Sequence, residues 1–441
     1  PMPDGTFQRF QVYETEIMGP EVQALVPDKR TYVAKGIDDP TAVIHLDTGY
    51  FGLRAYGRTA QGTLWIDPWQ MGDKSVVISA WTRDFTASGE AWECGVPEGQ
   101  PDLPIPTAKA LPTSGDLLYT YRLSMCLTGE YTTFFGGVTP AVDASVTTIN
   151  RVNSVYEVDV AVRFLYQNVA PYTDPATDPF PTGTIVDGNL LAQNHATLDA
   201  LIGNGAYDIG HIFTQASGGL AYRPSVCNNT YKGYGGTGLA NPVGDVFDID
   251  YVSHEIGHQM GGSHTFNGST GNCAGANRSA SNAYEPGSGT TIMAYAGICG
   301  AENVQSNSDP YFHVRSLEQI IAVRNATCGV TYATGNTPPT INAGPDRNLP
   351  RGTTFYLSAE GNDVDGDALT YNFEQYDLGN ASPPTDRYGP LFRSYGPNGA
   401  YWRYFTDNPA AYLNLPTVDR SLTFRAIVRD NAASGGGVAD D

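Results

Sequence analysis

The sequence lacks any long apolar run, since no stretch reaches the about 18 residues that a membrane-spanning helix needs. It is also poor in charge, at 16% of residues, and acidic residues outnumber basic ones 46 to 25, which gives a net charge of −21. This balance disfavours nucleic acid and anionic membranes as partners, and it suits a solvated, secreted protein. The opening residues do not have the pattern of a signal peptide, so we expect any secretion signal to lie outside this sequence.

Cysteine is scarce and never forms a CxxC pair, which argues against a cysteine zinc site or a thioredoxin-like centre. The six cysteines are Cys94, Cys126, Cys227, Cys273, Cys299 and Cys328. Sparse, well-separated cysteines in a chain of this type predict two or three disulfides and an extracellular location.

Glycine, proline and tyrosine are abundant, with 50, 30 and 27 residues among 441, and 41% of residues are hydrophobic. This composition predicts a loop-rich, β-containing protein of two to four domains. We expect a β-rich segment at 1–100, then a proline-rich linker at 101–115 that is exposed to proteolytic cleavage. A second linker is expected at 334–345. Alternating strands at 346–441 predict an all-β, Ig-like sandwich that the end of the sequence cuts short.

The segment 116–333 alternates between strands and helices. We expect strands at 117–131, 158–167 and 207–214, and helices at Thr139–Glu157 and Gly188–Ile202. This alternation predicts an α/β (α+β) fold with a mixed, mostly parallel sheet. We then expect a strand at 218–227, a glycine-rich loop at 233–245, and helices at 250–262 and 315–328. Asp248 or Asp250 is expected to cap the first of these helices, and Gly261 with Gly262 to end it.

Residues 254–264 read HEIGHQMGGSH, which has the form HExxHxxGxxH. On a helix, residues four apart share a face, so His254 and His258 can bind one ion, and Glu255 can act as general base on the water that the ion activates. Gly261 can take a positive φ and turn the chain back, so that His264 supplies a third nitrogen. Three protein ligands and one open position are typical of a catalytic zinc site. A structural zinc site would have a fourth protein ligand and no use for Glu255.

A methionine follows the histidines, within the sequence TIMAY at 291–295. The order HExxHxxGxxH and then a Met-turn is the metzincin pattern. In this pattern Met293 would form the apolar floor below the three imidazoles. Taken alone, Met293 could also be an ordinary core methionine, but its order and spacing after the three histidines favour the Met-turn.

On these motifs, residues 115–330 resemble metzincins of the reprolysin-like (adamalysin-like) group, in the secreted bacterial branch. The segments that carry the resemblance are 120–131, 250–266, 284–299 and the closing helix. The resemblance implies a secreted zinc endopeptidase that hydrolyses proteins or peptides. It also implies one catalytic zinc ion held by the three histidines, and an N-terminal propeptide over about residues 1–100.

The resemblance implies two disulfides, one that joins the region before the zinc helix to the last helix and one that spans the Met-turn region. The matching pairs are Cys227–Cys328 and Cys273–Cys299. It also implies an edge strand above the cleft that pairs with extended substrate. The expected strand contains Gly219, Leu220 and Ala221.

Two positions depart from the adamalysin pattern. Adamalysins usually place Asp directly after the third histidine, where it supports the structure around the site, but here the residue is Thr265. Tyr295, two residues after the methionine, resembles the arrangement of astacins and serralysins, in which this tyrosine stabilises the oxyanion. A packed aromatic side chain is the alternative interpretation of Tyr295.

The N-terminal segment contains ECGVP at 93–97, which resembles the cysteine switch of matrix metalloproteinases. The Cys94 thiolate would occupy the open zinc position and exclude the nucleophilic water, since thiolate is a good zinc ligand. If the two disulfides above form, Cys94 and Cys126 remain. Cys126 then reads as a buried free thiol in a strand, and a Cys94–Cys126 disulfide is the alternative.

Three further interpretations stay open. The acidic segment 362–367 could bind calcium, although a tight turn is the reading that we favour because the EF-hand pattern is missing. A gluzincin-type peptidase would use Glu302 or Glu318 as third ligand, but His264 at the metzincin position argues against it. Outside enzymes, the chain could be a surface adhesin with a degenerate protease domain, which the intact Glu255 argues against. We expect a monomer.

Overall fold

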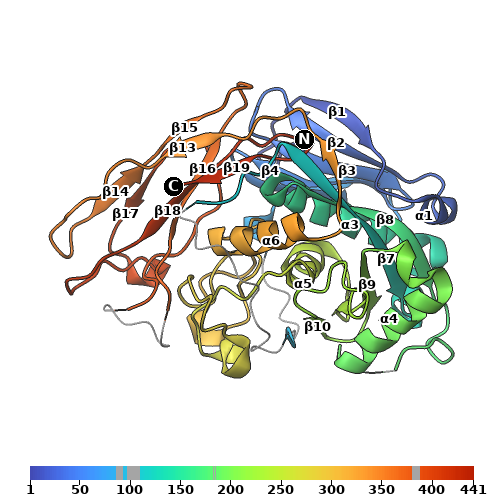
Figure 1. Ribbon diagram of the computed structural model, residues 1–441. Helices are drawn as coiled ribbons and strands as arrows, with labels where there is room; N and C mark the ends of the chain where they lie inside the picture. Colours follow the sequence, from blue (N-terminus) through green and yellow to red (C-terminus); the bar gives the residue numbers. More distant parts are fainter. Residues whose placement is uncertain (86–92, 97–109, 182, 184, 380–387) are drawn as a thin grey trace.

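The computed structural model describes residues 1–85, 93–96, 110–181, 183, 185–379 and 388–441 (Figure 1). In Figure 1 the N-terminal sheet (blue) and the C-terminal strands (orange and red) lie above the central region with its green helices. Of the expected linker 101–115, residues 101–109 lie outside the described residues. Within the described part of the chain, no helix has the length and apolarity needed to cross a membrane.

The N-terminal region forms an antiparallel sheet of six strands in sequential order. The strands are β1 (Phe10–Thr15), β2 (Arg30–Gly36), β3 (Val43–Gly49), β4 (Gly52–Thr59), β5 (Gly62–Pro68) and β6 (Val77–Trp81), with helix α1 (Pro20–Leu25) after β1. Because side chains alternate along a strand, the sheet has two different faces. One face has a small core that includes Ile44, Leu64 and Trp81, and the other packs on a long central helix.

That helix is α3 (Val138–Val160), which is buried along almost its whole length. Apolar residues such as Val146 and Ile149 belong to the main core. Polar residues meet the N-terminal sheet, where Lys29 Nζ lies 2.6 Å from Asp47 Oδ1 and 3.1 Å from Asp143 Oδ1, with all three side chains buried. The contact between the two regions therefore includes buried charge as well as apolar packing.

The central sheet is mixed, with parallel pairs at its centre, as the strand–helix alternation predicted. Its order is β10-β11-β9-β7-β12, and β8 also pairs with β7. The strands are β7 (Leu117–Leu127), β8 (Val162–Pro171), β9 (Ile209–Thr214), β10 (Gly218–Ala221), β11 (Gly235–Gly238) and β12 (Val330–Ala333). The pairs β7–β8, β7–β9 and β9–β11 are parallel, whereas β10–β11 and β7–β12 are antiparallel. Strand β10 is thus an edge strand.

Several expected elements have different bounds. The segment 233–245, expected as a loop, contains strand β11. The strand expected at 117–131 ends at Leu127, because Thr128 caps helix α2 (Gly129–Phe135) by accepting a hydrogen bond from the Tyr131 N–H. Helix α4 (Gly188–Ile202) has the expected bounds, and α6 (Val314–Ala326) lies close to them.

The helix that carries the HExxH sequence begins earlier than expected. A π-helical turn, Val246–Ser253, runs directly into α5 (His254–Gln259), so Asp248 and Asp250 lie inside the helix and cap nothing. Asp248 instead accepts hydrogen bonds from Thr148 Oγ1 (2.6 Å) and Arg151 Nη1 (2.8 Å) of α3. The helix ends as expected, since Gly261 has φ +96° and reverses the chain.

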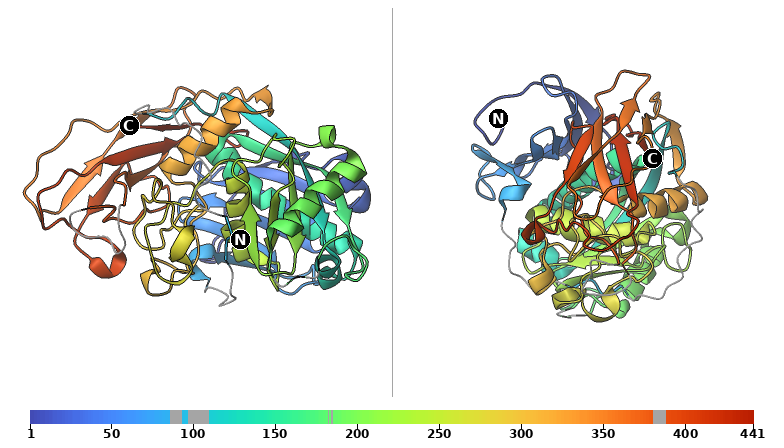
Figure 2. Two further views of the ribbon diagram at one scale, coloured as in Figure 1. Left: turned by 60° about the horizontal axis from the view of Figure 1, so that its bottom comes forward. Right: turned by 90° about the vertical axis from the view of Figure 1, so that its left-hand side faces the viewer.

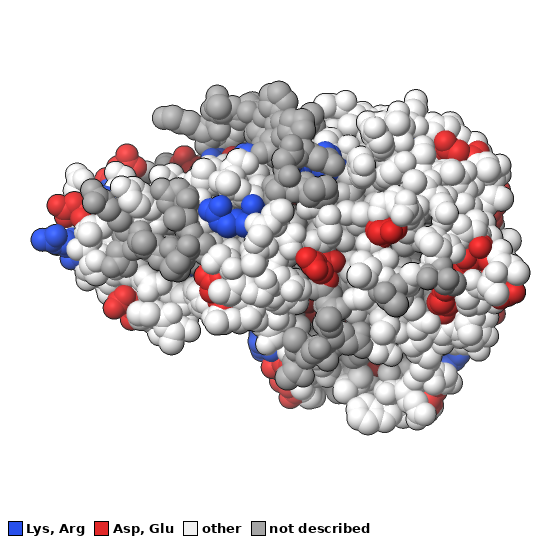
Figure 3. All heavy atoms as spheres, turned by 90° about the horizontal axis from the view of Figure 1, so that it is seen from below, with Lys and Arg blue, Asp and Glu red and all other residues white. Residues whose placement is uncertain are grey.

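In the described part of the C-terminal region, three small sheets surround one apolar core. The strands are β13 (Thr340–Asn342), β14 (Phe355–Ser358), β15 (Glu360–Asn362), β16 (Thr370–Gln375), β17 (Trp402–Phe405), β18 (Phe424–Arg429) and β19 (Val438–Asp440). These strands project from one side of the molecule (Figure 2). On the face seen from below, acidic side chains are spread widely, and the coloured residues form no continuous basic band (Figure 3).

Candidate metal centre

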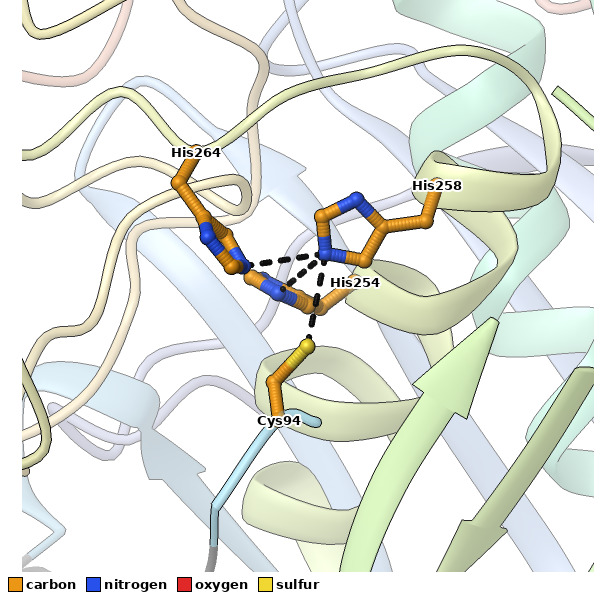
Figure 4. A group of neighbouring side chains, drawn as sticks. All are labelled: Cys94, His254, His258 and His264. Carbon is orange, nitrogen blue, oxygen red and sulfur yellow. Dashed lines mark hydrogen bonds between the residues drawn. The ribbon is translucent and has the colours of Figure 1, made fainter. Parts of the chain in front are cut away.

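Three histidines converge at the end of α5 (Figure 4). His254 and His258 lie one helical turn apart on α5, and the reversal at Gly261 brings His264 back towards them. His258 Nε2 lies 3.0 Å from His254 Nε2 and 3.1 Å from His264 Nε2. The structure therefore brings together the three residues that the sequence predicted as metal ligands.

Each imidazole is held at its far side by a backbone carbonyl. The Nδ1–oxygen pairs are His254 with Ile292 (2.7 Å), His258 with Gly262 (2.7 Å) and His264 with Asn277 (2.6 Å). A carbonyl oxygen can only accept a hydrogen bond, so each Nδ1 carries the proton and each Nε2 is the unprotonated nitrogen. Metal-binding histidines are oriented in this way.

Cys94 completes the group, with its Sγ 3.5 Å from His258 Nε2. Tetrahedral zinc, with bonds of about 2.0–2.1 Å to nitrogen and about 2.3 Å to sulfur, would separate two nitrogens by about 3.3 Å and a nitrogen from sulfur by about 3.6 Å. The observed separations of 3.0, 3.1 and 3.5 Å are close to these values. The donor set and its spacing therefore fit zinc.

Burial keeps His254 and His258 in the neutral form. It lowers the pKa of His254 to about 3 and also lowers the pKa of His258. Both side chains are fully buried. Since a neutral imidazole is the form that binds a metal, these histidines need no deprotonation to do so near neutral pH.

Glu255 lies between the cysteine and the edge of the sheet. Its side chain is fully buried and faces the Cys94 thiol. It occupies the space that a Cβ at Gly219 would need, so the edge strand can approach only with glycine there. Burial raises the pKa of Glu255 to about 8, so this carboxyl can hold a proton at neutral pH.

Tyr295 and Met293 border the same site. The Tyr295 hydroxyl donates a hydrogen bond to the Cys94 carbonyl oxygen (3.3 Å), and its ring centroid lies 4.7 Å from that of His264. Met293 is fully buried, and its sulfur would collide with a Cβ placed at Gly257. Tyr295 thus packs against His264, and Met293 packs against Gly257, which directly precedes His258.

The expected substrate strand, β10, is paired in this structure with the segment around Cys94. Gly95 N–H donates to Gly219 O (2.8 Å), and Gly219 N–H donates to Glu93 O (3.0 Å). Cys94 and Gly219 are partners in a parallel bridge. The backbone of the N-terminal segment therefore uses the hydrogen-bonding groups of Gly219 at the open edge of the central sheet.

The cysteines pair as the resemblance implied. Cys227 and Cys328 are at disulfide distance, with Cα atoms 5.8 Å apart, and so are Cys273 and Cys299, with Cα atoms 5.1 Å apart. Cys94 and Cys126 are both free and buried. The alternative Cys94–Cys126 disulfide is therefore not formed.

The other proposed acidic ligands lie away from the histidines. Glu302 accepts a hydrogen bond from Ser269 N–H (2.6 Å), and Glu318 pairs with Arg315 (3.0 Å). Neither belongs to the histidine group among the described residues, so the gluzincin alternative has no support. Around Asp363, the carboxylate accepts the N–H groups of the two acids that follow, which is the geometry of a tight turn.

Sequence reasoning missed the groups that orient the histidines. The carbonyls of Ile292, Gly262 and Asn277 belong to three separate places in the chain, and any residue can supply a carbonyl. It also missed Glu285, a fully buried carboxylate between the third histidine and the Met-turn. No spacing rule marks this residue.

Comparison with known families agrees with this geometry. The model of the reprolysin-like metallo-peptidase family M12B matches residues 118–322, which include the three histidines and Met293. The match supports a reprolysin-like metzincin domain and a zinc metalloprotease activity in general, and it implies a bound metal, typically zinc. No curated protein matches the chain.

Proposed function

We propose that this protein is a secreted zinc endopeptidase that is made as a latent zymogen, with Cys94 as the inhibitory thiol. The observation that carries the proposal is the convergence of three histidine Nε2 atoms and one sulfur, with each Nδ1 held by a carbonyl. Three histidines, one exchangeable fourth position and an adjacent carboxylate form the donor set of a catalytic zinc site.

When bound, zinc would polarise the scissile carbonyl and acidify the attacking water. Glu255 would take the proton of that water and deliver it to the leaving amine. Its position supports this role, because it is buried next to His254 and faces the group that fills the fourth position. The Tyr295 hydroxyl, which now donates to the Cys94 carbonyl, would donate to the oxyanion of the substrate.

Latency would depend on the segment 93–95. With Cys94 at the fourth position and its backbone on β10, both the nucleophile and the substrate are excluded. A cut in the expected linker would free this segment from the central region. Gly219 N–H and O would then be available to an extended substrate, which β10 would bind as an added strand.

The chain after the cut would stay attached. Leu111 N–H donates to Asp440 Oδ1 (2.6 Å), and Ser114 Oγ accepts from Arg324 Nη1 (2.9 Å). A cleavage before residue 110 would therefore leave a mature enzyme whose first residues pack on the C-terminal region. For 346–441 we propose an Ig-like sandwich, since its three small sheets share one core.

The test is a caseinolytic assay on the intact chain and after limited proteolysis, with zinc content measured on both and Glu255→Ala as the inactive control. We expect about one zinc per chain, no activity before cleavage, and activity afterwards that the control lacks. A chain that binds no zinc, or that stays inert after loss of the N-terminal region, would contradict the proposal and favour a binding protein.

A further inference from the structure

Glu285 accepts hydrogen bonds from both sides of the metal centre. Its side chain is fully buried. Oε1 accepts from Thr265 Oγ1 (2.7 Å) and from Thr291 Oγ1. Oε2 accepts from Thr290 N–H (2.8 Å) and from Thr291 N–H (3.3 Å). All of these donors are uncharged, so a buried carboxylate is held here entirely by hydroxyl and amide groups.

The two sides joined by Glu285 are those that place the third histidine and the methionine. Thr265 directly follows His264, and Thr291 precedes Met293 by two residues. The backbone reinforces the link, since Thr265 N–H donates to Met293 O (3.0 Å) and Glu285 N–H donates to Thr265 O (2.8 Å). A substitution at Glu285 would therefore alter both the segment that follows His264 and the segment that contains Met293.

The same segment also orients His254. Ile292, whose carbonyl accepts the His254 Nδ1–H at 2.7 Å, lies between Thr291 and Met293. The hydrogen bonds of Glu285 to Thr290 and Thr291 thus fix the backbone immediately before that carbonyl. Two of the three imidazoles depend on segments that Glu285 ties together.

We propose that Glu285 is a positioning residue that fixes His264, the Ile292 carbonyl and Met293 relative to one another. Thr265, which directly follows the third histidine, has no carboxylate, and Glu285 supplies one to this part of the site. The proposal rests on the proposed zinc site. It concerns the geometry of the ligands and assigns Glu285 no contact with metal or substrate.

A carboxylate is needed because its two oxygens accept from five donors, the fifth being Thr290 Oγ1 at 3.4 Å from Oε2. Glutamine at 285 has nearly the same volume, but its amide nitrogen would face donors and leave some of them unsatisfied, which is costly in a buried site. Replacement of groups that orient metal ligands typically weakens metal binding or activity by about 10–100-fold. Aspartate would keep the charge but shorten the reach.

The experiment compares Glu285→Gln and Glu285→Asp with Glu157→Gln as a matched control. Glu157 is also buried, its carboxylate is held by Arg163 at 2.7 Å on both oxygens, and it does not belong to the group of Cys94, His254, His258 and His264. The first readout is the spectrum of the six methionine methyls in protein labelled with [ε-13C]methionine and freed of metal. We expect Glu285→Gln to shift or broaden the Met293 signal, and Glu157→Gln to leave it unchanged.

The second readout uses the metal. In cobalt-substituted protein, we expect Glu285→Gln to alter the d–d absorption bands and to speed metal loss to a chelator by about 10–100-fold. Glu285→Asp should restore part of both properties, and Glu157→Gln should change neither, even if it lowers the melting temperature equally. If Glu285→Gln does not fold, Thr291→Val removes one donor and should produce smaller changes of the same kind.

The proposal is overturned if the Glu285 or Thr291 variants keep the wild-type Met293 signal and cobalt spectrum while losing only thermal stability. Failure of the proposed function has a different signature, because the wild-type chain would then take up neither zinc nor cobalt. The methionine spectrum of the metal-free protein still decides the role of Glu285 in that case.

Discussion

The guanidinium of Arg429 and the carboxylate of Asp159 form a fully buried ion pair, with Nε 2.9 Å from Oδ1. Arg429 ends strand β18 of the C-terminal region, and Asp159 lies in the last turn of α3. Asp159 also accepts from Arg58 Nη2 (2.7 Å) of the N-terminal region and from Phe312 N–H (2.8 Å). One carboxylate therefore joins all three regions of the chain.

This arrangement predicts that Arg429→Met destabilises the processed protein more than the intact chain. Without Arg429, Asp159 still pairs with Arg58 in the intact chain, but it has neither arginine once the N-terminal region has left, and only Phe312 N–H still donates to it. Breaking a buried pair costs about 3–5 kcal/mol, and we expect this loss in the processed form and a smaller one before cleavage. Denaturant unfolding of the intact and the processed forms measures this loss of unfolding free energy. Arg58→Met should affect only the intact chain, and equal losses for Arg429→Met in both forms would refute the asymmetry.

Cys94→Ser should abolish latency. Serine is a poor zinc ligand, so the intact variant should cleave casein without prior proteolysis, whereas the wild type should not. Cys126→Ser is the matched control, because Cys126 is also a free, buried cysteine but lies within β7. We expect Cys126→Ser to stay latent. Equal latency of the two variants would show that the thiol of Cys94 does not hold the zymogen inactive.

Asp245→Asn and Asp248→Asn should change the stability of the protein in opposite directions at pH 8. Burial raises the pKa of Asp245 to about 7, and the neighbouring charges of Asp248 and Asp309 add to this, opposed by the Tyr56 hydroxyl and Arg151. A folded pKa above the unfolded value of about 3.9 means that the charge of Asp245 destabilises the protein as pH rises from about 4 to 7.

Asp245→Asn should therefore stabilise the intact chain at pH 8 by roughly 2–4 kcal/mol and have little effect near pH 4. Asp248 differs, because it accepts from Thr148 and Arg151, so Asp248→Asn should lower stability at pH 8. Melting temperatures across this pH range provide the measurement. A pH-independent effect of Asp245→Asn would mean that its carboxylate is not the destabilising group.

Gly219→Ala should impair catalysis in the activated enzyme. A Cβ at this position would overlap the Glu255 carboxylate, so either the edge strand or the general base must move. We expect kcat/KM to fall by at least about 100-fold, since displacement of a catalytic group by about 1 Å has that effect. Gly188→Ala, in α4, is the control, because nothing lies near its Cβ position. If Gly219→Ala has the kinetics of the wild type, β10 does not line the proposed substrate cleft.

The sequence was informative where chemistry depends on local spacing. HExxHxxGxxH sets two histidines on one helical face and places a glycine at the reversal, and the structure has φ +96° at Gly261. The mixed sheet followed from the alternation of strands and helices. The roles of these residues in catalysis and latency stay predictions until they are measured.

Sequence reasoning failed where tertiary contacts outweigh local preference. Glycine disfavours strands, so the glycine-rich segment 233–245 was expected as a loop. In β11, however, Gly236 lies so close to Ile212, and Gly238 so close to Ala216, that only a residue without a side chain fits at each position. Asp248 looked like a helix cap, but it is drawn into an ion pair with Arg151 from another helix. Glu285 could not be found, because its donors come from two segments that only the fold brings together.

The buried charges between the N-terminal sheet and α3 also bear on how the proposed activation would end. The charged groups of Lys29, Asp47 and Asp143 are buried away from water where they contact one another. The cost of this desolvation offsets much of the attraction between them. While the chain is continuous, the tether gives the N-terminal region a high effective concentration at this surface. A single cut removes that advantage, and water can then solvate the exposed charges on both sides. We therefore expect the released segment to be a weak inhibitor in trans, so that activation proceeds in one direction upon dilution.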